Sequence, residues 1–227
     1  MNISPRSYRY LVPALLPLAA LYLLWRARKQ PSYLKNWGER FAWSEFPRPR
    51  APHPFIWIHA VSVGETNATR PLVQAILKRW PQCDILLTHM TPTGREAGQK
   101  IVQLAPDRIR QCFLPYDAVY AVRKFLKQTQ PVLGLLMETE VWPTVLEEAR
   151  SQGIPMVLVN GRLSEKSFNQ AMRVPDLMKK AMGRFSAVCA QADSDAQRFL
   201  KLGTVEPVIT GSLKFDIQAP KSALTKA

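Results

Sequence analysis

The sequence is poor in cysteine and glycine, and no tract of it repeats. Its three cysteines, Cys83, Cys112 and Cys189, are widely spaced and lie in or beside apolar runs, so they predict neither a disulfide framework nor a zinc cluster. A reducing compartment is the default for such a chain. Ten glycines and 19 prolines without a repeat exclude collagen-like, linker-like and solenoid proteins. A chain of 227 residues of which 47% are apolar is instead typical of a folded protein with one sizeable core or two small ones.

Acidic residues are also scarce, since 17 Asp and Glu stand against 31 Lys and Arg and give a formal net charge of +14. Such a charge favours polyanionic partners, among them nucleic acid, phosphorylated ligands and an acidic membrane surface. Half of it lies in residues 1–50, which hold nine Lys and Arg but two Asp and Glu. Nucleic-acid binding predicts basic residues interleaved with exposed aromatics on the body of a protein, so this position favours anionic lipid, and no nucleic-acid partner is expected.

Residues 10–25 are almost entirely apolar and carry no charge. As a helix they span roughly 24 Å, less than the roughly 30 Å of a hydrocarbon core, and Pro13 and Pro17 weaken the helix further. We expect a membrane anchor with its basic flank in residues 1–30, for which spanning is marginal. A cleaved signal peptide is disfavoured because no small-x-small site precedes a polar start, and a buried core helix rarely has charges at both ends. The flanking cations, which also predict a cytoplasmic body, are Arg6, Arg9, Arg26, Arg28 and Lys29.

A basic, proline-rich joint at 31–54 precedes a body in which short apolar runs alternate with longer amphipathic stretches. This alternation predicts an α/β fold, a Rossmann-like parallel sheet with flanking helices, in residues 55–217, followed by a tail or truncated linker at 218–227. Pro71 predicts that the first helix of the body begins near it or is kinked there. The seven runs expected to be strands are 55–61, 84–89, 109–114, 132–138, 155–160, 186–191 and 206–211.

Polar residues follow each of these runs. In an open α/β sheet, ligands bind outside the carboxyl ends of the strands, so these positions are the first candidates for a site. Turn and cap roles are the favoured interpretation of Asp117, Asp193 and Ser194. They explain the longer charged side chains less well, and those side chains could converge on one cleft: Glu138, Glu140, Arg162 and Lys214.

Other signatures of nucleotide or metal binding are absent from the sequence. No GxxxxGK[ST] pattern occurs, and Val63-Gly64-Glu65 is not a GxGxxG fingerprint, so neither a P-loop nor a dinucleotide site is predicted. His59 and His89 fall inside apolar runs, and we expect them to be core or strand-end histidines and not metal ligands.

Seven short sequence motifs, which follow the N-terminal apolar segment in a fixed order, show a family resemblance. They are NWGERF (36–41), HAVSVGET (59–66), MTPTG (90–94), LPYD (114–117), METEVWP (137–143), NGRLSEKS (160–167) and GSLKFD (211–216). From about Ser7 to Ile217 the chain resembles the bacterial 3-deoxy-D-manno-octulosonic acid (Kdo) transferases of lipopolysaccharide synthesis. The resemblance implies a two-domain GT-B fold and transfer of Kdo from CMP-Kdo to a lipid A precursor, lipid IVA, at the cytoplasmic face of the inner membrane.

The resemblance also implies roles for individual residues. Glu65 would be the general base that deprotonates the acceptor hydroxyl, a task for which a glutamate with a reference pKa of about 4.3 is ionised at neutral pH. Glu138 and Lys214 would help to stabilise the transition state, where a cation can offset the sugar carboxylate or the departing phosphate. No metal or other cofactor is expected. Acceptor-binding roles are expected for Ser62, Gly64, Thr66, Thr91, Thr93, Glu140, Asn160 and Arg162.

The same resemblance makes this chain the N-terminal, acceptor-binding half, because the sugar-nucleotide half that normally follows GSLKFD is absent from the sequence. We therefore expect no independent catalysis. Simpler alternatives are a strand-end cap for Glu138, a solvated loop lysine for Lys214, and, for the chain, a non-catalytic membrane-associated module that binds anionic lipid or nucleic acid through its basic surface. A second α/β domain of about 200 residues in the downstream reading frame would favour the transferase.

Overall fold

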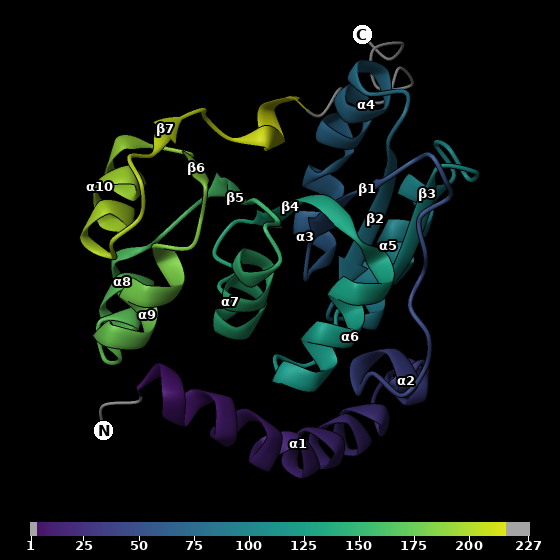
Figure 1. Cartoon of the computed structure of the whole chain (residues 1–227), viewed down its shortest axis with the longest axis horizontal. Helices are drawn as coiled ribbons and strands as arrows, with labels where there is room; N and C mark the ends of the chain where they lie inside the picture. The colour runs from purple at the N-terminus through teal and green to yellow at the C-terminus, as the bar shows by residue number, and fades with distance from the viewer. Residues whose placement is uncertain (1–3, 217–227) are drawn as a thin grey trace, which may run out of the picture.

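The computed structural model describes residues 4–216, and its centre is a seven-stranded parallel sheet (Figure 1). The strand order is β3-β2-β1-β4-β5-β6-β7, and every neighbouring pair is parallel. The predicted α/β fold is confirmed, because parallel strands buried on both faces produce the continuous apolar runs seen in the sequence. The strands are β1 (Phe55–His59), β2 (Asp84–His89), β3 (Ile109–Phe113), β4 (Pro131–Met137), β5 (Met156–Gly161), β6 (Ala187–Ala190) and β7 (Val208–Ile209).

Helices cover both faces of this sheet. Alternate residues of β1 point to opposite faces: Trp57 belongs to a core shared with α6, α7, α9 and α10, whereas Ile56 and Ile58 belong to a core shared with α3, α4 and α5. Pro71 lies in the first turn of α4, so the prediction that a helix begins near this proline is confirmed. The helices of the body are α3 (Val63–Ala68), α4 (Arg70–Arg79), α5 (Pro92–Val102), α6 (Val119–Thr129), α7 (Pro143–Ser151), α8 (Glu165–Ala171), α9 (Pro175–Met182) and α10 (Asp193–Lys201), and a 3-10 turn, η2 (Leu213–Asp216), follows β7.

The order in which strands are added to the sheet reverses at β1, whose two neighbours are β2 and β4. From β1 the chain adds β2 and β3 on one side, and it then crosses over to place β4 on the other side of β1. The crevice at the carboxyl ends of two such strands is the usual ligand site of an open α/β sheet. This switch point therefore locates the candidate site between the segments that follow β1 and β4.

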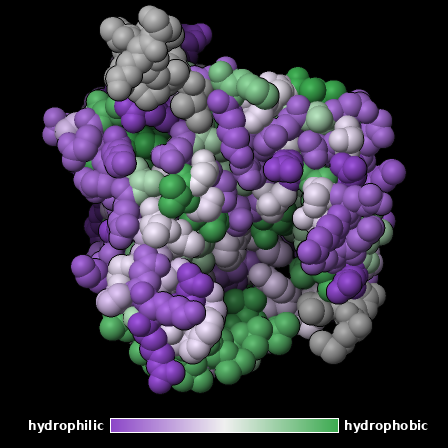
Figure 2. All heavy atoms as spheres, turned by 180° about the vertical axis from the view of Figure 1, so that it is seen from behind, coloured by the Kyte–Doolittle hydropathy of each residue, from purple (hydrophilic) through white to green (hydrophobic). Residues whose placement is uncertain are grey.

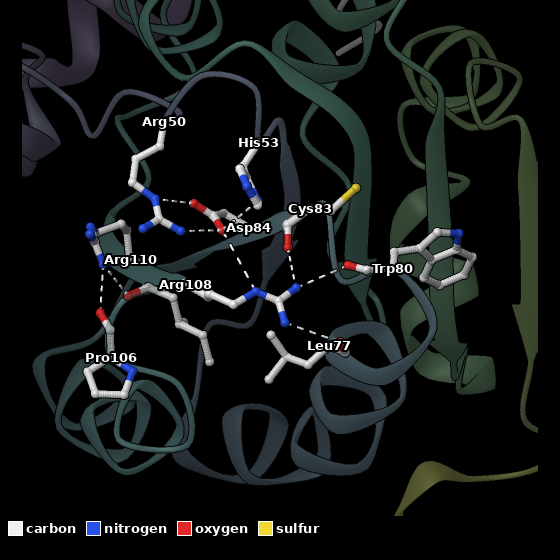
Figure 3. A network of polar contacts seen from close by, with 10 residues as sticks. Arg50, His53, Leu77, Trp80, Cys83, Asp84, Pro106, Arg108 and Arg110 are labelled. Atoms are coloured by element: carbon white, nitrogen blue, oxygen red, sulfur yellow. Dashed lines mark hydrogen bonds and ion pairs between the residues drawn. The ribbon is translucent and has the colours of Figure 1, made fainter.

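The joint at 31–54 is packed onto the sheet. It contains a 3-10 turn, η1 (Pro31–Leu34), and the short helix α2 (Trp37–Arg40), whose Glu39 accepts a hydrogen bond from the backbone N–H of Phe113 at 2.7 Å and pairs with Arg95. At its other end, Arg50 makes two hydrogen bonds to the buried Asp84 at the start of β2 (Figure 3). These contacts fix the joint to β2 and β3. The tail at 218–227 lies outside the described residues.

The N-terminal helix α1 (Pro5–Ala27) is continuous despite Pro13 and Pro17. It runs along the outside of the body, at the bottom of the view in Figure 1, and Leu23 is its one buried residue among those described. The alternative of a buried core helix is therefore wrong. By length and composition, α1 is the one helix within residues 4–216 that could cross a membrane.

Candidate active site

Three carboxylates and one lysine meet at the switch point of the sheet. Glu65 lies in α3, which follows β1, whereas Glu138 and Glu140 follow β4, and Lys214 lies in η2 beyond β7. Lys214 Nζ is 3.6 Å from Glu138 Oε1. Burial, followed by the negative charges of Glu65 and Glu138, raises the pKa of Glu140 to about 7, although the hydrogen bond from Trp142 acts in the opposite direction. The structure thus brings together four of the residues that the sequence singled out.

Glu65 is held by a reciprocal cap at the start of α3. Ser62 Oγ accepts the backbone N–H of Glu65 at 3.3 Å, and the same hydroxyl donates to Glu65 Oε1 at 2.7 Å. The backbone N–H of Val61 donates to Glu65 Oε2 at 2.9 Å. This is a variant of the capping box, for which the Ser-x-x-Glu spacing is the sequence signature, because Glu65 accepts the N–H of the residue before the N-cap Ser62. Each carboxylate oxygen still has a free lone pair, so the fixed carboxylate can accept a further hydrogen bond.

Neighbouring residues support this loop. Thr66 is buried and donates to the carbonyl oxygen of Ser62 at 2.8 Å, and Thr91 donates to the carbonyl oxygen of Val61 at 2.8 Å. Gly94 lies so close that a Cβ on it would sit 2.7 Å from the Val61 oxygen. The side chains of Thr66 and Thr91, both expected to bind the acceptor, are therefore used to hold the Glu65 loop. Two further residues with that expected role, Gly64 and Thr93, are exposed.

The segment after β4 presents the other two carboxylates. Glu138 has a φ of 56°, a left-handed conformation that is uncommon for a residue other than glycine and is frequent at functional sites. Glu140 Oε2 accepts a hydrogen bond from the indole N–H of Trp142 at 2.9 Å. The Trp142 ring in turn meets the His59 ring edge-on at a centroid distance of 5.8 Å. Trp142 was not among the predicted site residues, although it lies in the METEVWP motif.

Asn160 holds the segment that carries Lys214. It is 1% exposed, has a φ of 56°, and its Oδ1 accepts the backbone N–H of Leu213 at 3.1 Å. Its carbonyl oxygen accepts a hydrogen bond from Gln191 at 3.0 Å. The predicted acceptor-binding residue Asn160 therefore fixes η2 over the sheet. Arg162 is exposed, and within residues 4–216 no ion pair joins it to the acidic cluster.

Both histidines expected to be core residues are fully buried. Burial lowers the pKa of His59 to about 3 and that of His89 to about 4, so both are neutral at physiological pH. No group of three or more His, Cys, Asp or Glu side chains within the described part of the chain could hold a metal ion.

The cap role expected for Asp117 is confirmed, although the helix that it caps is α7.

Comparison with known proteins gives a consistent result along most of the chain. Residues 35–217 match the model of a family described as 3-deoxy-D-manno-octulosonic-acid transferase (kdotransferase). A 3-deoxy-D-manno-octulosonic acid transferase of Bordetella pertussis is 44% identical over 218 residues, which cover 93% of this chain and 50% of the relative. A protein of the same name from Haemophilus influenzae is 30% identical, with 92% of this chain and 49% of the relative covered.

Solved structures resemble the fold at low identity. A UDP-GlcNAc 2-epimerase from Neisseria meningitidis aligns with a TM-score of 0.52 at 12% identity, covering 71% of this chain and 48% of its own. A putative UDP-N-acetylglucosamine 2-epimerase from Listeria monocytogenes aligns with a TM-score of 0.52 at 13% identity, covering 73% and 48%. At such identities the likeness extends to the fold alone.

Proposed function

This chain belongs to the 3-deoxy-D-manno-octulosonic-acid (Kdo) transferase family and spans about half the length of the curated relatives it matches, and from this we propose that it is the acceptor-binding half of an inverting GT-B glycosyltransferase. The reaction is transfer of Kdo from CMP-Kdo to a lipid A precursor, lipid IVA, in lipopolysaccharide synthesis. The observation that carries the proposal is the meeting of Glu65, Glu138, Glu140 and Lys214 at the switch point. Acids and a cation in one crevice are what proton removal and charge stabilisation require.

In this proposal Glu65 is the general base. Its carboxylate, fixed by Ser62 and the Val61 N–H, takes the proton of the acceptor hydroxyl through a free lone pair. The acceptor oxygen then forms a bond to the anomeric carbon of Kdo, and the bond from that carbon to the CMP phosphate oxygen breaks, with the electron pair leaving on the phosphate. Pre-fixing the base removes the need to order it during the reaction.

The other members of the cluster have complementary roles. Lys214, whose side chain is 52% exposed, can meet the Kdo carboxylate or the departing phosphate when the donor arrives. Glu138 orients that lysine through the 3.6 Å contact. With a pKa of about 7, Glu140 carries a proton for part of the time at neutral pH and can donate a hydrogen bond to an oxygen of the acceptor.

Membrane attachment is part of the proposal, and α1 is the segment that provides it. Apolar side chains gather at the lower edge of the molecule, along which α1 runs (Figure 2). The exposed fraction is 81% for Tyr10, 59% for Leu18, 60% for Leu21 and 57% for Trp25. With the cations at both ends of the helix, these side chains suit the interface of an anionic bilayer, which we propose to be the cytoplasmic face of the inner membrane.

The contacts of α1 favour a helix that lies in the plane of the interface. Near its start the Tyr8 hydroxyl donates to Asp117 at 2.8 Å, and near its end Arg26 donates to the Tyr33 hydroxyl at 3.0 Å. Between them, Leu23 packs with Tyr33 and Phe41. A helix attached to the body along its length cannot cross the bilayer unless the body enters the hydrocarbon. In-plane binding leaves the body in water.

Joining this chain to the C-terminal half of the Bordetella pertussis relative tests the proposed function, with CMP-Kdo and lipid IVA in anionic vesicles as substrates. We expect the joined protein to transfer Kdo, and the 227-residue chain alone to bind the acceptor without turnover, because CMP-Kdo is proposed to bind the other half of the relatives. A folded, vesicle-bound chimera without activity, beside an active relative, would favour the non-catalytic lipid-binding module. Robust transfer by the pure chain alone would contradict its role as a half enzyme.

A further inference from the structure

The carboxylate of Asp117 connects two elements that lie far apart in the sequence. Asp117 follows β3 and is 3% exposed. Its Oδ2 accepts the hydroxyl of Tyr8 in α1 at 2.8 Å and also the backbone N–H of Thr144 at 2.9 Å, while its Oδ1 accepts the N–H of Val145 at 2.9 Å. One buried side chain thus binds both the first turns of α1 and the first turn of α7.

The first turn of α7 depends on this remote carboxylate. The first backbone N–H groups of a helix have no partner within the helix, and a cap residue usually supplies one. The residue at the N-cap of α7 is Trp142, which makes no side-chain cap hydrogen bond. Asp117 therefore takes the place of the local cap and fixes where α7 begins.

The position of that first turn determines the position of a carboxylate of the site. Trp142 lies directly before α7, and its carbonyl oxygen accepts the N–H of Leu146 at 2.9 Å. Its indole N–H donates to Glu140 at 2.9 Å. Tyr8 is thus linked to Glu140 in three steps. A hydrogen bond joins Tyr8 to Asp117, the first turn of α7 joins Asp117 to Trp142, and a second side-chain hydrogen bond joins Trp142 to Glu140.

A second contact joins α1 to the middle of α7. Arg9 Nη2 is 3.6 Å from Glu148 Oε1, and Glu148, which is 4% exposed, also accepts a hydrogen bond from Arg123 at 2.7 Å. Between α1, α7 and α9 there remains a cavity of about 170 Å³, lined by Tyr8 and Pro143 among others. Apolar side chains of α1 also pack against the core that includes α7, and the polar contacts, which require a defined geometry, add a preferred orientation of α1 on α7.

We propose that Asp117 is a positioning residue that transmits the docking of α1 on α7 to the Glu140–Trp142 segment of the site. For catalysis the inference rests on the proposed function, but the coupling itself concerns this chain alone. When α1 is docked, Trp142 is held and Glu140 is placed beside Glu65 and Glu138. When the Tyr8 hydroxyl is lost, α1 stays on the membrane through its apolar side, and the segment before α7 becomes less ordered.

Tyr8→Phe in the 227-residue chain on anionic vesicles or micelles tests this coupling. The substitution removes one hydroxyl, and Tyr10→Phe on the same helix is the matched control because Tyr10 is 81% exposed. The readout is hydrogen exchange of the Trp142 indole N–H by NMR, assigned with Trp142→Phe. We expect exchange to quicken by roughly two- to tenfold in Tyr8→Phe, the factor for one lost hydrogen bond, with vesicle binding and circular dichroism unchanged. Equal exchange in Tyr8→Phe, Tyr10→Phe and the parent chain would overturn the proposal.

The joined, active protein separates this inference from the proposed function. There Tyr8→Phe is expected to lower kcat severalfold while KM for CMP-Kdo stays unchanged, because CMP-Kdo is proposed to bind the other half of the enzyme. If the joined protein has no activity but the Trp142 exchange responds to Tyr8→Phe, the proposed function fails and the coupling stands. If activity is normal and the exchange does not respond, the proposed function stands and the coupling fails.

Discussion

The ammonium nitrogen of Lys214 lies 3.6 Å from a carboxylate oxygen of Glu138, although the two residues are carried by segments that follow different strands. An ion pair whose lysine is 52% exposed contributes only about 0–1 kcal/mol to stability. The pair is therefore not needed to hold the fold together. Its position beside two further carboxylates at the switch point of the sheet favours a role in charge stabilisation.

Replacing Lys214 separates these two roles. Lys214→Ala is expected to change the free energy of unfolding by less than about 0.5 kcal/mol, since the pair is exposed. In the joined, active protein it is expected to lower turnover strongly at every pH tested, because the proposed role of the lysine is to stabilise charge and not to exchange a proton in the reaction. Unfolding curves and pH–rate profiles measure the two effects. Lys166→Ala, on the exposed side of α8, is the control, and equal turnover in the two variants would remove Lys214 from the mechanism.

Asn160 is expected to control where Lys214 lies. Asn160→Gly keeps the left-handed conformation accessible but removes the oxygen that accepts the Leu213 N–H. Exchange of the Leu213 amide should quicken by roughly two- to tenfold, as expected for one lost hydrogen bond, while the strands keep their protection. Hydrogen exchange followed by NMR provides the measurement. An unchanged Leu213 amide would mean that other contacts hold η2 in place.

The raised pKa of Glu140 predicts that Glu140→Gln is more stable than the parent chain at high pH. Because this pKa is raised to about 7, the folded chain binds the proton more tightly than the unfolded chain, in which a glutamate has a pKa of about 4.3. The folded state therefore loses stability as the pH rises between these values. Glu140→Gln has no proton to lose and retains an oxygen for the Trp142 indole. It should be more stable than the parent chain at pH 8, by an amount that vanishes towards pH 4.

Denaturant unfolding of both proteins at several pH values checks this sign. Glu96→Gln, on the exposed side of α5, serves as the control for a carboxylate without burial. A stability difference for Glu140→Gln that does not depend on pH would show that Glu140 is not held in its protonated form.

The sheet could be predicted from the sequence because buried parallel strands are read directly as apolar runs, as β1, β2 and β4 illustrate. The carboxyl ends of those strands also identified Glu138 and Glu140. The roles of Tyr8 and Trp142 could not be predicted in the same way. The partner of Tyr8 lies 109 residues away in the sequence. The partner of Trp142 is Glu140, only two residues away, but no local sequence pattern predicts a hydrogen bond between an indole and a carboxylate at this spacing. The Ser62–Glu65 capping box, by contrast, had a sequence signature.

The orientation of α1 was also beyond the reach of the sequence. Residues 10–25 are apolar on every side, so hydropathy cannot distinguish the side of the helix that contacts the body from the side that is exposed. Leu23 and Leu24 are adjacent and chemically identical, yet Leu23 is 2% exposed and Leu24 is 49% exposed. Only the packing of α1 against η1 and α2 separates them.

Depth measurements on vesicles test whether α1 lies in the interface. Spin labels at Tyr10→Cys and Leu18→Cys, with Cys189 replaced, should report similar depths of about 5–10 Å below the headgroup boundary. A spanning helix would place Leu18 near the centre of the bilayer, about 15 Å deep, and Tyr10 near its surface. Electron paramagnetic resonance with oxygen and a water-soluble relaxation agent gives both depths, and a large difference between the two sites would contradict the in-plane arrangement.

The most direct test of the proposed reaction is the turnover of Glu65→Gln in the joined protein, measured with CMP-Kdo and lipid IVA across the pH range. The substitution keeps the size of the side chain and removes its basicity. Because glutamine also occurs at this capping-box position, any loss of stability should stay below the roughly 0.5–2 kcal/mol of a lost N-cap. Ser164→Ala, which removes the N-cap of α8, controls for a stability loss of that kind. We predict that Glu65→Gln lowers kcat by roughly 10²–10⁴-fold while Ser164→Ala stays near the parent value. Near-normal turnover of Glu65→Gln at every pH would contradict Glu65 as the base, and Glu140 would become the next candidate.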